Sequence, residues 1–96
     1  MLRNYLVMYD VCDDKRVKAA FKTMCGFGEH LQFSVFRCDL SPMALVKMKS
    51  AMSELIDHRE DQVLIFDLGP TDSAQMDLVE SLGVAYSSTG RTAVIV

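Results

Sequence analysis

Two near-continuous apolar runs stand out along the chain, and amphipathic segments separate them. Leu-Val-Met-Tyr occupies residues 6–9 and Val-Leu-Ile-Phe occupies residues 63–66. Short runs without polar alternation are typical of strands that are covered on both faces. We therefore predict two buried strands, the first of which is central and stops at Asp10.

Two helices are expected around these strands. The first has one apolar stripe, because apolar residues recur at positions i, i+3, i+4 and i+7, namely Val17, Ala20, Phe21 and Met24. Asp13 or Asp14 can cap its start by accepting backbone N–H bonds, and Gly26 is expected to end it in a left-handed conformation. The second helix begins with Ser41 as the cap and Pro42 in the first turn.

The segment between the helices has a β pattern with an irregularity. Leu31, Phe33 and Val35 alternate with polar residues, and Phe36 breaks the alternation. One bent strand and two short paired strands both fit this pattern. After residue 70 we expect a short third helix, a short strand at residues 84–86 and a last apolar strand at residues 92–96.

This element order predicts one α+β domain over residues 1–96, with a ferredoxin-like βαββαβ sandwich and an extra C-terminal strand. The last strand is apolar and has no obvious cover. An unpaired apolar edge invites aggregation, and a two-fold dimer is the commonest way to cover one. We therefore expect a homodimer.

Composition narrows the function classes. The net charge of −3 argues against a general nucleic-acid binder, so a basic surface would have to be local. Residues 1–40 carry six Lys or Arg against five Asp or Glu, so this half is the better source of such a surface. The chain shows neither a bilayer-length apolar run nor a signal-peptide pattern, so we expect a cytoplasmic protein without a membrane partner.

Asp10 is the strongest candidate in the sequence for a residue that binds a ligand or a metal ion. It ends a buried strand, where α/β proteins tend to place ligands, and we expect its carboxylate to be poorly solvated. It could cap the following turn or bind a hard cation such as magnesium. On the first helix, Lys18 and Lys22 share a face with Lys15 that is either merely solvated or in contact with phosphate, and His30 opens the β segment beside polar groups.

Several stretches together resemble the Cas-two family, the small CRISPR-associated proteins of spacer acquisition. The sequence at residues 32–36, Gln-Phe-Ser-Val-Phe, is similar to the family's Gln-x-Ser-Val-Phe core. The other similar stretches are residues 5–11, 13–16, 39–42 and 61–69, so the resemblance covers roughly residues 2–70.

The resemblance implies a ferredoxin-like homodimer and a set of site residues. The family's metal-binding acid corresponds to Asp10, with Mg²⁺ held between the two Asp10 of a dimer. The family's helix Arg corresponds to Arg16, and the motif's serine and phenylalanine correspond to Ser34 and Phe36. His30 stands where the family often has Arg; it keeps hydrogen bonding but is only partly charged near neutral pH.

Three functions follow as alternatives. The favoured one is a scaffold for CRISPR adaptation that binds duplex DNA together with the Cas-one integrase, with nucleic acid contacted by Arg16, Lys18, Lys22, His30, Ser34 and Phe36. The second is a magnesium-dependent endonuclease that cleaves RNA, including single-stranded RNA, or DNA, with Asp10 as the catalytic residue. The third is a regulatory domain of the same fold that binds a small molecule.

Overall fold

The computed structural model describes residues 1–71 and 80–84, and this part of the chain contains four strands and two helices. The elements in chain order are β1 (Arg3–Asp10), α1 (Asp14–Cys25), β2 (Glu29–Gln32), β3 (Val35–Leu40), α2 (Pro42–Leu55) and β4 (Gln62–Pro70). The α+β class and the βαββαβ order are confirmed. The predicted third helix and the two C-terminal strands fall largely or wholly on residues 72–79 and 85–96, outside the described residues.

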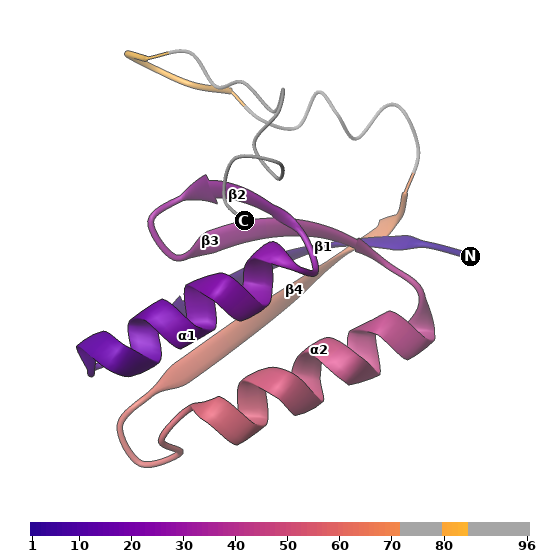
Figure 1. Ribbon diagram of the computed structural model, residues 1–96. Helices are drawn as coiled ribbons and strands as arrows, with labels where there is room; N and C mark the ends of the chain where they lie inside the picture. Colours follow the sequence, from indigo (N-terminus) through magenta and orange to yellow (C-terminus); the bar gives the residue numbers. More distant parts are fainter. Residues whose placement is uncertain (72–79, 85–96) are drawn as a thin grey trace.

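The four strands form one sheet in the order β2-β3-β1-β4, and every neighbouring pair is antiparallel. β1 is central, as predicted, because it pairs with β3 on one side and with β4 on the other. Both helices cover the same face of this sheet (Figure 1). The described part of the molecule therefore has two layers, with the core between the helices and the sheet.

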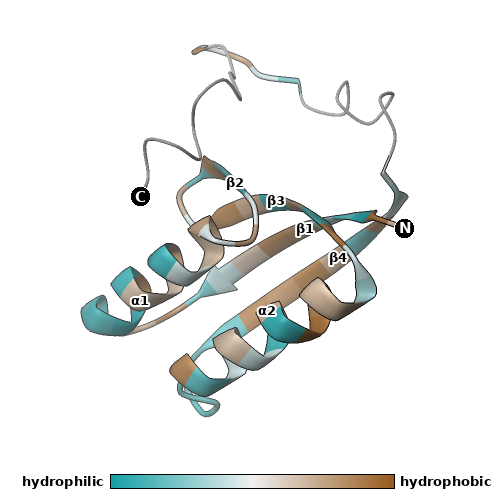
Figure 2. Ribbon diagram, turned by 45° about the vertical axis from the view of Figure 1, so that its right-hand side comes forward, coloured by the Kyte–Doolittle hydropathy of each residue, from teal (hydrophilic) through white to brown (hydrophobic). Residues whose placement is uncertain are grey.

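The core is built from one face of each element. Alternate residues of β1 and β3 are buried, and they form the core together with buried residues of α1 and α2. Figure 2 shows that apolar residues, in brown, recur along the strands and both helices. The buried core residues are Tyr5, Val7, Tyr9, Ala20, Met24, Phe36, Cys38, Leu40, Met48 and Met52. The stripe predicted for α1 is confirmed at Ala20 and Met24, which are buried, and at Phe21, which packs against the core; it is wrong at Val17, which is 38% exposed.

Both helices begin where the sequence predicts. The side chain of Asp13 accepts a hydrogen bond from the Arg16 N–H at 3.1 Å, and the Ser41 hydroxyl accepts one from the Ala44 N–H at 3.1 Å. The predicted left-handed end of α1 is wrong. Gly26 has φ −79° and continues the right-handed turn, and its N–H donates to the Thr23 carbonyl. Neither described helix is long and apolar enough to cross a bilayer.

The irregular segment between the helices is a β-hairpin, so the two-strand alternative is correct. β2 and β3 are antiparallel and are joined by Phe33 and Ser34. Phe33 has φ +43°, in the left-handed region that tight hairpin turns require. Because the turn interrupts the strand, the alternation of apolar and polar residues starts again in β3. This explains why Phe36 breaks the alternation that begins at Leu31.

The second strand that we predict to be buried, β4, is covered on one face only by the part of the chain that the structure describes. Its outward residues Leu64, Phe66 and Leu68 are 41%, 46% and 40% exposed. Both helices lie on the other side of the sheet, and β4 is an edge strand among the described residues. The apolar run therefore reflects an apolar face of the sheet that neither described helix covers.

Candidate nucleic-acid interface

Asp10 lies at the C-terminal end of β1, opposite Gln62 of β4. The pairing of β1 with β3 stops at Met8 and Val35, so Asp10 extends past the end of β3 and is exposed. The expected poor solvation of this carboxylate is therefore wrong for one copy of the chain. Asp10, Ser34 and Gln62 line the same hollow of about 240 Å³.

These three side chains offer carboxylate, hydroxyl and amide oxygens, which are the ligand types that Mg²⁺ accepts. No group of three or more His, Cys, Asp or Glu side chains gathers as a metal site within residues 1–71 and 80–84. The oxygen donors around Asp10 fit a cation that keeps several waters and takes only one or two carboxylates.

Arg16 is used inside the chain. Its Nε donates to Asp61 Oδ2 at 2.8 Å, and its Nη2 donates to Asp61 Oδ1 at 3.3 Å and to Glu60 Oε1 at 3.4 Å. This pairing joins α1 to the turn before β4. The guanidinium that the family resemblance assigns to nucleic acid is thus held by two carboxylates.

Asp61 is the centre of this network. Its carboxylate also accepts the N–H of Cys12 at 2.9 Å and the N–H of Asp57 at 2.8 Å. The hydrogen bond from Arg16, supported by these backbone donors, holds the pKa of Asp61 well below its usual value. Asp61 therefore stays ionised and anchors the loop that follows Asp10 to the turn before β4.

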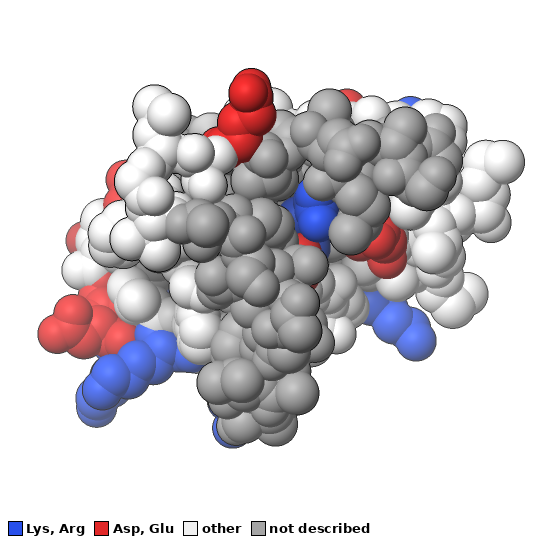
Figure 3. All heavy atoms as spheres, turned by 90° about the horizontal axis from the view of Figure 1, so that it is seen from above, with Lys and Arg blue, Asp and Glu red and all other residues white. Residues whose placement is uncertain are grey.

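Two lysines of α1 differ from three of the arginines in having no ion-pair partner among the described residues. Arg3, Arg16 and Arg37 each have a carboxylate partner. Lys18 and Lys22 are exposed, and they enter none of the ion pairs found in the described part of the chain. On the face drawn in Figure 3, basic and acidic side chains are interspersed, so a basic surface would be local, as the composition predicts.

His30 and Ser34 fasten the hairpin to its surroundings. The Nε2–H of His30 donates to the Phe33 carbonyl at 2.6 Å, since a carbonyl oxygen can only accept. The Ser34 carbonyl accepts the N–H of Tyr9 at 3.2 Å, which ties the turn to β1. His30 and Ser34 thus fix the turn between β2 and β3.

Phe36 requires a correction. Its side chain is fully buried, and its ring lies 6.2 Å from Tyr9, 5.7 Å from Phe21 and 5.1 Å from His30, measured between centroids. A ring enclosed in this way has no face left for a nucleotide. Its place in the Gln-x-Ser-Val-Phe motif is explained by packing against the aromatic side chains under α1.

The sequence reasoning missed two groups. The sequence gives no local signal for the role of Asp61, although its side chain is fully covered and is paired with Arg16. Phe33 was read as a strand residue, although its ring is 85% exposed at the hairpin turn. The break in alternation at Phe36 was the one available signal for the second case.

Comparisons with known proteins agree with this architecture. The family model described as CRISPR associated protein Cas2 matches residues 3–76. A protein of Geobacter sulfurreducens named CRISPR-associated endoribonuclease Cas2 is 45% identical over 92 residues, which is 96% of each chain. A Rhodospirillum rubrum protein, CRISPR-associated endoribonuclease Cas2 1, is 44% identical over 92 residues, 96% of this chain and 89% of its own.

Solved structures give the same result. Hypothetical protein TT1823 from Thermus thermophilus matches with a TM-score of 0.73 and 30% identity, over 91% of this chain and all of its own. The crystal structure of Streptococcus pyogenes Cas2 at pH 6.5 matches with a TM-score of 0.71 and 28% identity, over 83% of this chain and 99% of its own. The chain therefore belongs to the Cas2 family of CRISPR-associated proteins, the family that its sequence resembles.

Proposed function

We propose that this protein is a homodimeric scaffold of CRISPR adaptation, which binds duplex DNA together with the Cas-one integrase. The observation that carries the proposal is the exposure of Lys18 and Lys22 on one helix, without a carboxylate partner among the described residues. Exposed lysines of this kind contact phosphates without reading sequence. Arg16 is left out of this contact set because Asp61 and Glu60 hold it.

The dimer is supported by the open face of the sheet. Leu64, Phe66 and Leu68 of β4 are partly exposed there, and Leu6 and Met8 of β1 lie beside them in the register. A second copy of the same ferredoxin-like domain would cover this apolar face in a self-complementary way. A dimer would also present two copies of the α1 lysines to one duplex.

Replacing Lys18 and Lys22 together with Ala should weaken duplex DNA binding and flatten its dependence on salt. The slope of log K against log salt should fall by about 0.9 for each phosphate contact that is lost. The measurement is a fluorescence anisotropy titration of a short duplex at several salt concentrations. This result would support the exposed face of α1 as the surface that contacts the duplex.

The matched control is the double replacement of Lys47 and Lys49, which are exposed on α2. It removes the same charge from the other helix and should leave the slope of log K against log salt mostly unchanged. Equal losses for the two double variants would refute a specific role of α1. A wild-type affinity that does not change with salt would refute the scaffold.

A second candidate function is that of a magnesium-dependent nuclease. It is supported by the hollow at Asp10 and by the relatives, which are named as endoribonucleases. In this reading Mg²⁺ is held by Asp10 of each copy in the dimer. The ion would offset charge on a phosphodiester and help to ionise a water molecule. Ser34 and Gln62 would then orient the substrate beside the carboxylates, because they line the same hollow.

Replacing Asp10 with Ala should abolish magnesium-dependent cleavage of single-stranded RNA or duplex DNA, if this second function holds. Asp14→Ala, which removes an exposed carboxylate from the first turn of α1, is the control and should keep wild-type activity. All proteins are purified in the same way. Equal cleavage by all three proteins would identify a contaminating nuclease and leave the scaffold as the function. Family membership favours both readings over the small-molecule alternative.

A further inference from the structure

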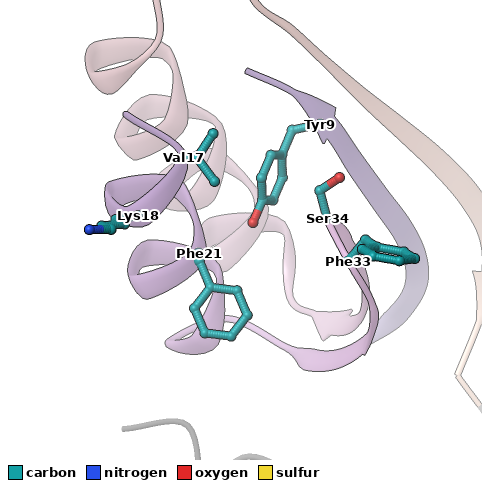
Figure 4. A pocket seen from close by; sticks show the side chains of 6 residues that line it. All are labelled: Tyr9, Val17, Lys18, Phe21, Phe33 and Ser34. Atoms are coloured by element: carbon teal, nitrogen blue, oxygen red, sulfur yellow. The ribbon is translucent and has the colours of Figure 1, made fainter. Parts of the chain in front are cut away.

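An apolar groove lies between α1 and the β2–β3 hairpin, on the helix side of β1. Its volume is about 520 Å³, and its lining residues are Tyr9, Val17, Lys18, Phe21, Phe33 and Ser34. Figure 4 shows Tyr9 between the helix and the hairpin, and Lys18 pointing outward from α1. The groove is in the size range of small-ligand sites, which are mostly apolar and carry a few polar groups.

Phe33 is costly for the stability of the free protein. Its ring is 85% exposed, and its backbone has φ +43°, which is unfavourable for a bulky residue. The His30 hydrogen bond to the Phe33 carbonyl, at 2.6 Å, holds the residue in this conformation. Strained and exposed residues that the surroundings hold in place are typical of binding sites.

We propose that this groove binds an unpaired nucleotide, with its base stacked on Phe33 and its phosphate beside Lys18. The proposal rests on the proposed nucleic-acid binding and adds a site for single-stranded segments. Phe33 lies on the hairpin side of the groove and Lys18 on the α1 side. Grooves that combine positive charge with aromatic side chains bind single strands by stacking, which every base can do. Lys18 is positively charged, and Lys22 adds a second positive charge one turn further along α1. These charges favour a ligand that carries a phosphate over a neutral one.

Two hydroxyl groups in the groove can meet the polar edge of a base. The hydroxyl of Tyr9 is protonated at neutral pH, as in any tyrosine, and can donate a hydrogen bond; burial raises its pKa further, to about 12. Ser34 supplies the second hydroxyl. Tyr9 and Ser34 also line the hollow that contains Asp10, so the two cavities adjoin at these residues. A strand that leaves the groove past Ser34 would therefore run toward Asp10.

The test compares binding of a single-stranded DNA of roughly ten nucleotides with binding of the same sequence as a duplex. Phe33→Asn removes the ring and suits the left-handed backbone, so this variant should fold with an unchanged or higher Tm. It should weaken single-strand binding about tenfold and leave duplex binding unchanged. Phe33→Tyr should keep wild-type affinity. Met43→Asn, at an exposed apolar position on α2, is the control and should have no effect.

The outcomes separate this site from the proposed function. Unchanged single-strand affinity in Phe33→Asn would overturn the nucleotide site. Equal weakening of single-strand and duplex binding would also overturn it, because a stacked duplex offers no free base to Phe33. If the wild type binds neither DNA, the proposed function fails together with this inference.

Discussion

Phe36→Ala is expected to lower the free energy of unfolding by about 4 kcal/mol, the largest loss that we predict for a single substitution. Phe36 is fully buried, and its ring contacts aromatic rings from β1, α1 and β2. Truncation would leave a cavity under α1 that these neighbours can fill only in part. Urea unfolding followed by circular dichroism would measure this loss of stability. Nucleic-acid binding by Phe36→Ala should fall in proportion to the fraction of the variant that is unfolded.

Phe36→Leu separates packing from direct contact. A leucine fills most of the volume, so the loss should be about 1 kcal/mol, and nucleic-acid binding should be kept. Phe33→Ala is the exposed counterpart and should change stability by less than about 0.5 kcal/mol. If Phe36→Leu folds normally but loses its ligand, the assignment of Phe36 to the core alone is wrong.

Gly28→Ala is expected to destabilise the protein by about 2–3 kcal/mol. A Cβ at position 28 would lie 2.6 Å from the Arg37 carbonyl oxygen and even closer to Cys38 Sγ. Both obstacles belong to β3, and Cys38 is fully buried, so neither can move away cheaply. The midpoint of thermal or urea unfolding measures the effect.

Gly26→Ala is the matched control, two residues earlier in the same loop. Its backbone is right-handed, and the nearest atom to an added Cβ is the Thr23 carbonyl oxygen at 3.3 Å. The change should cost less than about 1 kcal/mol. Similar losses at both positions would mean that loop entropy, and not the close approach to β3, makes glycine necessary at position 28.

Local patterns predicted most of the described fold. Asp13, Ser41 and Pro42 start the helices because their side chains and ring act on the adjacent backbone, which the sequence shows directly. The apolar stripe of α1 likewise predicted that Ala20 and Met24 would be buried. Such signals depend on neighbours within one turn of helix, so no tertiary knowledge is needed to read them.

The candidate site was harder to predict, because its features depend on long-range partners. Arg16 looked available for nucleic acid until Asp61, 45 positions later, was placed beside it. The run in β4 looked buried, because hydropathy alone cannot tell a helix layer from an open face such as the one that exposes Phe66. Only the position of Asp10 at a strand end followed from the local pattern, and its exposure depends on where β3 stops.

The strand order has a consequence for the way in which the chain folds. β2 and β3 are joined by a two-residue turn, so this hairpin can form early and locally. β1 is made first, but one of its two partners, β4, begins only at residue 62. Closing such a long loop is slow and costs entropy. Until β4 leaves the ribosome, the nascent chain carries an apolar central strand with one unpaired edge, and this interval is when it is most exposed to aggregation.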